Sequence, residues 1–156
     1  VVTKWHSNGA VAETGQYVEG RRSGDWLGYF RDGEAYFREF YNDNRLVQGA
    51  AVDERGKRYV YDELSRYAYP EKGMEAFNTY VTREIRRPEG SAGTRIRLLF
   101  QVGRKGDLWD FVVLEGGSPA CEQEALRLVR EGPPWRQGLE HGHIPVPSQG
   151  YAIIQF

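Results

Sequence analysis

RIRLLFQVGRKGDLWDFVVLEGGSPACEQEALRLV, residues 95–129, predicts two strands joined by a turn and followed by a helix. The first strand is indicated by apolar residues at every second position, Ile96, Leu98, Phe100 and Val102. Gly103 and Gly106, within the segment 103–107, provide the backbone freedom that a tight hairpin turn needs. The return strand is expected over residues 108–114, with Trp109, Phe111 and Val113 on one face.

The same stretch then predicts a helix that opens at Ser118-Pro119, because proline is favoured in the first helical turn. Its apolar residues fall at helical spacing: Cys121, Ala125, Leu128 and Val129. On this stripe the single cysteine is interpreted as a small buried hydrophobic residue. The result is a ββα core that needs at least one more strand.

Composition limits the possible functions before any motif is considered. The chain has 156 residues, of which 40% are apolar and 13% aromatic, enough for a core in one ordinary domain or two small ones. A net charge of −1 with 28% charged residues argues against general binding to nucleic acid or to anionic membranes. One cysteine excludes an intramolecular disulfide, and no apolar run approaches the roughly 18 residues of a membrane span. A membrane anchor is therefore expected only if it lies upstream of this chain.

Residues 1–65 carry a pattern of aromatic residues and glycines that recurs after about 24 residues, as expected for an array of short stacked units. Each unit is predicted to be a β-hairpin, with turns at Asn8-Gly9 and Asp32-Gly33 and a third, altered copy around Gly56. The segment resembles MORN-type repeats of the kind found in antitoxin-component-like proteins. The first unit matches at Trp5, Asn8, Gly9, Gly15, Tyr17, Gly20, Gly24 and Trp26, whereas the second has Glu39 and Gln48 in place of glycines.

Residues 66–156 are predicted to form the second domain. A helix is expected over Glu71–Arg86, where Met74, Phe77, Val81 and Ile85 recur at helical steps, and a last strand over Tyr151–Phe156. The predicted fold class is α+β: an N-terminal β-hairpin array followed by a three-stranded antiparallel sheet with two helices on one face.

Residues 70–156 resemble the C-terminal domain of TonB-family energy transducers of Gram-negative bacteria. The matching positions occur in the family's order: Gly73-Met74-Glu75-Ala76-Phe77, Gly93, Gly106, Cys121-Glu122-Gln123-Glu124-Ala125-Leu126, Pro134-Trp135, Gly138 and Gly142. Arg87-Pro88 stands where the family usually has tyrosine-proline.

The resemblance implies a periplasmic module that binds a peptide of an outer-membrane transporter and works with an inner-membrane proton-channel complex. The implied means is β-augmentation, in which an extended peptide adds to the exposed edge of a sheet. The implied accepting edge is the last strand, with the preceding loop nearby, so the candidate partner-binding residues are Arg87, Pro88, Gln149, Tyr151, Ile153 and Gln155.

No combination of residues predicts an enzyme, a cofactor or a metal. His141 and His143 lack a nearby cysteine or acidic pair, and we interpret them as part of a solvated loop. The glycines around Arg104-Lys105 resemble a phosphate loop, but no helix N-terminus follows them. A non-transporting periplasmic scaffold for protein interaction therefore remains the alternative function. A homodimer formed through the last strand is compatible with either function.

Overall fold

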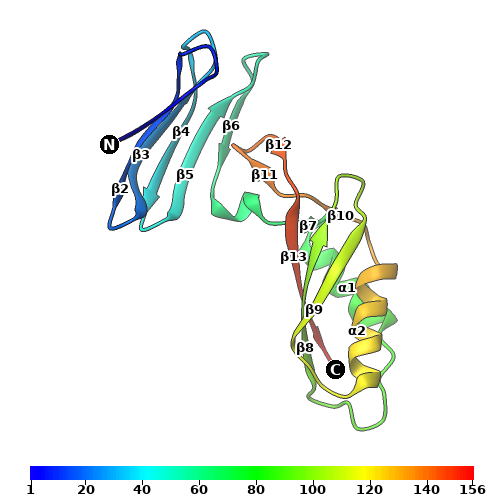
Figure 1. Ribbon diagram of the computed structural model, residues 1–156. Helices are drawn as coiled ribbons and strands as arrows, with labels where there is room; N and C mark the ends of the chain where they lie inside the picture. Colours follow the sequence, from blue (N-terminus) through cyan, green and yellow to red (C-terminus); the bar gives the residue numbers. More distant parts are fainter. The chain divides into compact units, whose positions relative to one another are not determined.

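The computed structural model describes all 156 residues. The fold is α+β, with mostly antiparallel sheets and two α-helices. The chain forms two compact units, shown in Figure 1. Unit 1 comprises residues 1–66 and 139–144, and unit 2 comprises residues 67–138 and 145–156. The predicted division into residues 1–65 and 66–156 did not include the return of residues 139–144 to the first unit.

Unit 1 is a six-stranded antiparallel sheet in which the strands lie in chain order. Its strands are β1 (Val2–Trp5), β2 (Val11–Val18), β3 (Arg21–Tyr29), β4 (Ala35–Asn42), β5 (Arg45–Val52) and β6 (Arg58–Tyr61). A short 3-10 helix, η1 (Glu63–Arg66), follows, and the hairpin of β11 (Leu139–Glu140) and β12 (Ile144–Pro145) comes from the later part of the chain.

Three turns at one end of this sheet share one hydrogen-bonding pattern. The amide N–H of the first residue donates to the carbonyl of the fifth in residues 6–10, 30–34 and 53–57, and a glycine N–H donates back to the first residue. The turns expected at Asn8-Gly9 and Asp32-Gly33 are therefore present, and the altered copy around Gly56 folds in the same way. At the other end, Asp43 and Asn44 both adopt positive φ, as in the two-residue turns that suit twisted hairpins.

Aromatic rings of unit 1 lie over glycines on neighbouring strands. Gly28 pairs with Phe37 across β3 and β4, and a Cβ atom added at Gly28 would lie 1.9 Å from the Phe37 ring. The same relation joins Gly49 to Tyr61. The glycines are required here by the space that the rings occupy.

Gly28→Ala is expected to lower the free energy of unfolding of unit 1 by about 1–3 kcal/mol, the usual cost of overpacking. Gly28 does not have a positive φ, so the backbone accepts alanine and only the contact with Phe37 is changed. Urea denaturation followed by the NMR signal of the buried Trp26 indole measures the effect in unit 1. An unchanged midpoint would mean that the Phe37 ring does not lie over this strand in solution.

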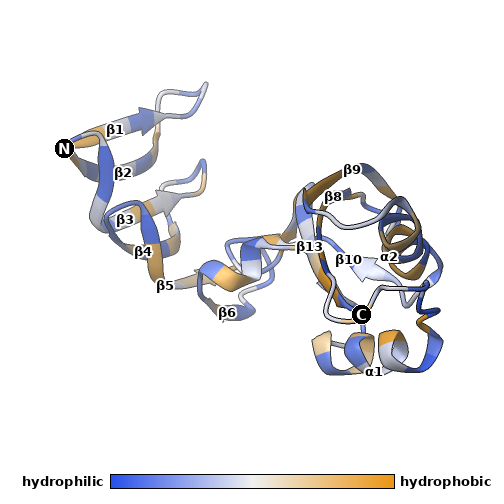
Figure 2. Cartoon of the chain, turned by 90° about the horizontal axis from the view of Figure 1, so that it is seen from below, coloured by the Kyte–Doolittle hydropathy of each residue, from blue (hydrophilic) through white to orange (hydrophobic).

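Unit 2 contains a three-stranded antiparallel sheet in the order β13 (Ser148–Gln155), β8 (Arg95–Val102) and β9 (Leu108–Glu115). Helices α1 (Met74–Glu84) and α2 (Pro119–Glu131) pack into one core with the buried face of this sheet. The short strands β7 (Tyr69–Pro70) and β10 (Trp135–Arg136) pair with each other. Figure 2, coloured by hydropathy, shows orange, hydrophobic stretches on β9 and α2.

The segment that predicts this unit folds largely as expected. Ile96, Leu98, Phe100 and Val102 are all fully buried. The turn closes where Gly103 N–H donates to Asp107 O at 2.8 Å. The Ser118 side chain accepts a hydrogen bond from Cys121 N–H at the start of α2, as its capping position predicts.

Three details of the prediction for unit 2 are wrong. The helix expected over Glu71–Arg86 is shorter, because Gly73 has φ of 89° and Ile85 is extended. The last strand begins at Ser148 and not at Tyr151. On β9, Asp110 takes a positive φ and the register with β8 shifts, so the alternation is broken and Leu108 and Phe111 face the core.

Candidate partner-binding edge

Strand β13 pairs with β8 in an unbroken antiparallel register from Ser148–Val102 to Gln155–Arg95. Its even-numbered residues are buried, whereas Gln149, Tyr151, Ile153 and Gln155 are exposed. The side chains expected to contact a partner are thus on the solvent side of the sheet.

The backbone of the same residues points away from β8. Gln149 O accepts a hydrogen bond from Ala68 N–H at 3.2 Å, outside the sheet, whereas Phe156 N–H donates to Thr94 O on the β8 side. Because backbone polar groups alternate in direction along a strand, those of Tyr151, Ile153 and Gln155 face the free edge. No backbone hydrogen bond pairs them there.

The two edges of this sheet differ in their protection against strand addition. Sheet edges are usually blocked by charges, prolines or bulges. Strand β9 carries Asp110 with its bulge and ends at Glu115. Strand β13 has the sequence SQGYAIIQ, with no charge, no proline and no break in register. Only the β13 edge is therefore both regular and uncharged.

The exposed face beside this edge is partly apolar. Tyr151 is 37% exposed and Ile153 is 46% exposed. Tyr151 lies in one cross-strand row with Leu99 and Val112. Arg97 Nε donates to the Tyr151 hydroxyl at 2.6 Å, which fixes the ring over the sheet. An added strand would find an ordered apolar surface at this position.

Arg87 and Pro88 lie in the connection between α1 and β8. Pro88 O accepts from Ser91 N–H at 3.1 Å, in a turn that leads to Gly93 and Thr94. It is Gly93 that donates to Phe156 O, at the end of the last strand. No hydrogen bond or ion pair joins Arg87 or Pro88 themselves to β13, so the structure groups four of the six candidate residues along one edge.

The interpretation of His141 as part of a solvated loop is wrong. Its side chain is only 11% exposed, and Nδ1 lies 2.9 Å from Glu39 Oε1 within unit 1. Glu39 is 1% exposed and accepts hydrogen bonds from the hydroxyls of Tyr41 and Tyr61, at 2.7 and 2.8 Å. Burial raises the pKa of Glu39, but the hydrogen bonds from His141, Tyr41 and Tyr61 and the charge of His141 outweigh it and lower that pKa to about 2.

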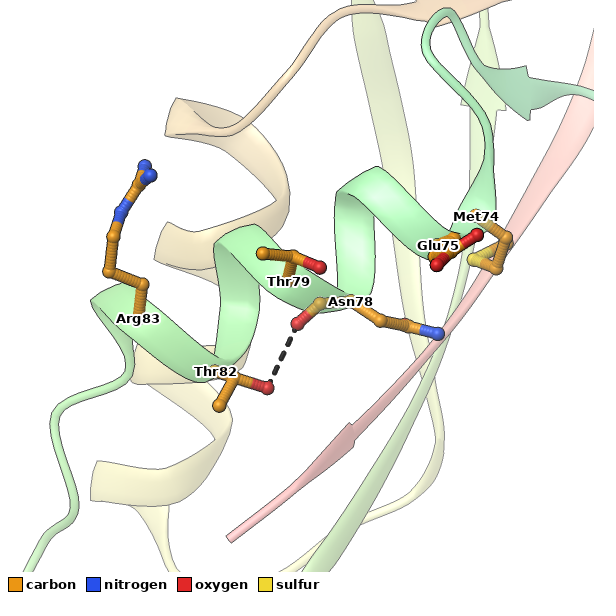
Figure 3. A pocket seen from close by; sticks show the side chains of 6 residues that line it. All are labelled: Met74, Glu75, Asn78, Thr79, Thr82 and Arg83. Carbon is orange, nitrogen blue, oxygen red and sulfur yellow. Dashed lines mark hydrogen bonds between the residues drawn. The ribbon is translucent and has the colours of Figure 1, made fainter.

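One further feature of the surface is a pocket on unit 2. Figure 3 shows a shallow depression along one helix, α1, with Met74 and Glu75 near one end and Arg83 at the other. Its one internal hydrogen bond runs from the Thr82 hydroxyl to Asn78 O at 3.0 Å. No group of three or more histidine, cysteine, aspartate or glutamate side chains is placed to hold a metal ion. Neither helix is long and apolar enough to cross a membrane.

Comparisons of the chain with protein-family profiles, with curated proteins and with solved structures find no match.

Proposed function

We propose that this chain binds an extended peptide by adding it as a fourth strand beside β13. The observation that supports this most directly is the regular, uncharged edge at which the backbone groups of Tyr151, Ile153 and Gln155 have no partner. An incoming backbone would satisfy these groups, and its alternate side chains would lie beside Tyr151 and Ile153.

We further propose, from the sequence resemblance, that the peptide belongs to an outer-membrane transporter and that the chain is the periplasmic part of a TonB-type energy transducer. The inner-membrane proton-channel complex would then be its second partner. Backbone pairing suits such a role because it resists pulling along the strand with little demand on side-chain identity. The MORN-like residues 1–65 would serve as a packing or protein-binding surface in the same molecule.

NMR titration of the whole chain with N-terminal peptides of outer-membrane transporters tests the proposal. Shifts are expected along Gln149–Gln155, and methylation of alternate peptide amides should weaken binding at least about tenfold, because it removes ladder donors without changing side chains. Ile153→Lys should also weaken binding, whereas Leu114→Lys, an exposed apolar position on β9, is the matched control. Equal binding by methylated and unmodified peptides would contradict strand addition.

A non-transporting scaffold is the second candidate, and a different observation favours it. Unit 1 exposes apolar side chains on β4, β5 and β6, namely Phe40, Val47 and Val60. Isolated exposed apolar residues are ordinary, but a group on adjacent strands is typical of contact surfaces. A lack of peptide-induced shifts anywhere at saturating concentration would favour this function. Shifts at β13 that depend on protein concentration without peptide would indicate a homodimer.

A further inference from the structure

Residues 138–148 leave unit 2, enter unit 1 and return. Two hydrogen bonds join the ends of this segment: Gly138 N–H donates to the Ser148 hydroxyl at 2.8 Å, and Val146 N–H donates to Gly138 O at 3.1 Å. Its tip, residues 139–144, is part of unit 1. The tip carries the sequence His141-Gly142-His143.

Each imidazole of the tip stacks on an aromatic ring of unit 1. The His141 ring lies 4.0 Å from the Phe37 ring at 17° between planes, and the His143 ring lies 4.6 Å from that of Tyr59. Between them, a Cβ atom at position 142 would lie 2.6 Å from Tyr61, so glycine is needed there. The two imidazole rings and the glycine between them therefore match the aromatic surface of unit 1.

The groups that surround the His141 ring also contact one another. The Glu39 carboxylate is held by Tyr41 on its own strand, by Tyr61 on β6 and by the Arg66 guanidinium, 3.5 Å away. Phe37 and Tyr36 are packed against each other, with ring centroids 4.9 Å apart. All these groups belong to residues 1–66, so their contacts with one another do not involve the tip.

The tip buries few of its own side chains. His141 is its only buried residue, and it adopts a positive φ of 49°, which is unfavourable for a side chain other than glycine. Ile144 is 40% exposed. Segments with little buried apolar surface and local strain open more readily than the sheet on which they rest.

We propose that unit 1 contains a preformed binding site for an imidazole group, built from Glu39, Phe37 and Tyr61, which His141 fills as a reversible plug. The carboxylate accepts the ring N–H, the Phe37 face stacks on the ring, and Tyr61 shapes the backbone turn. The ligand class is a histidine side chain on a glycine-containing turn, and residues 139–144 of this chain supply it. This site is separate from the β13 edge and does not depend on the function proposed there.

The site is tested by replacing the plug with free imidazole. His141→Gly empties the site and relieves the positive φ, and it should lower the thermal midpoint reported by the Trp26 indole of unit 1. Millimolar imidazole at pH 7 should restore several degrees in a saturable manner, as expected for a ligand that binds only the folded state. The double variant Glu39→Gln/His141→Gly is the control and should show no saturable recovery. Absence of recovery in the single variant, or equal recovery in both, would overturn the proposal.

A measurement on the unmodified chain covers the case in which the single variant fails to fold. The ring C–H signals of His141 should move towards those of a solvent-exposed histidine as imidazole concentration rises, while the signals of Tyr41 and Trp26 stay in place. Imidazole that leaves the His141 signals unchanged up to the highest soluble concentration would show that the tip is a permanent part of unit 1 and would also overturn the proposal.

Discussion

Glu39→Gln is expected to destabilise unit 1 by about 3 kcal/mol at pH 7, since a pKa lowered from 4.5 to about 2 corresponds to that free energy. The glutamine has the same shape, so the change removes charge without opening a cavity. It weakens the hydrogen bonds from Tyr41, Tyr61 and His141, all of which are made inside the unit. The effect should appear in urea denaturation followed by the Trp26 indole.

The pH dependence of the same variant provides a separate check. Because the folded-state pKa of Glu39 is depressed, its contribution is fully present above pH 4.5 and is lost as the pH falls through about 2. The difference in free energy of unfolding between the wild-type chain and the variant should therefore shrink steadily between pH 4.5 and 2. A difference that stays constant over this range would mean that the carboxylate charge is not the source of the stabilisation.

Asp25→Asn is the matched control for a strand carboxylate with an arginine partner. Asp25 pairs with Arg38 at 3.0 Å, but both side chains are largely exposed. Exposed pairs contribute little, so this change should alter the free energy of unfolding far less than Glu39→Gln does. An equal loss in the two variants would show that burial does not distinguish them.

The local patterns of the sequence predicted those parts of the fold that depend on neighbouring residues. The alternation of apolar residues predicted β8, Gly103 and Gly106 predicted the turn after it, and Ser118-Pro119 predicted the start of α2. The bulge on β9 was missed because Asp110 carries no signal for a positive φ comparable to that of glycine. Such a residue adopts this conformation only when the surrounding strands hold it there.

The contact between Glu39 and His141 could not be predicted because the two residues are 102 positions apart in the chain. One signal was nevertheless present: a glutamate replaces the glycine that the first repeat unit has at the equivalent position, Gly15. A glutamate at a position where an aromatic ring normally covers a glycine becomes buried, so its carboxylate requires hydrogen-bond partners. Sequence alone did not identify those partners.

Part of the geometry of the candidate edge can be read from the sequence. The alternation of exposed and buried residues along β13 can be read from the sequence, and Gln149, Tyr151, Ile153 and Gln155 share its solvent side. Whether that edge is open depends on which strand lies at the end of the sheet, and this follows only from the order β13-β8-β9. Arg87 and Pro88 lie in a loop, and local sequence patterns do not predict where the backbone of a loop runs.

Trp135→Ala is expected to have the largest effect in unit 2, lowering its free energy of unfolding by about 3–5 kcal/mol. Trp135 is 1% exposed, and its ring contacts Phe100 of β8 and Phe77 of α1, with centroids 4.9 and 5.4 Å apart. The substitution leaves a cavity between the sheet and the helix. Urea denaturation followed by the Ile154 methyl signal measures unit 2, and the Trp26 indole serves as the internal reference for unit 1.

Two matched variants separate the cavity from other effects of the change. Trp109 on β9 is 39% exposed, so Trp109→Ala should cost much less. The buried indole N–H of Trp135 has no hydrogen-bond partner, so Trp135→Phe removes no polar contact and should also cost less than the alanine change. Trp135 pairs with Pro70 across β10 and β7, close to the Ala68 N–H that binds Gln149 O. If Trp135→Ala loosens this connection, peptide binding at β13 should weaken in that variant and persist in Trp109→Ala. Similar losses in the free energy of unfolding in Trp135→Ala and Trp109→Ala would contradict the central position of Trp135 in the core.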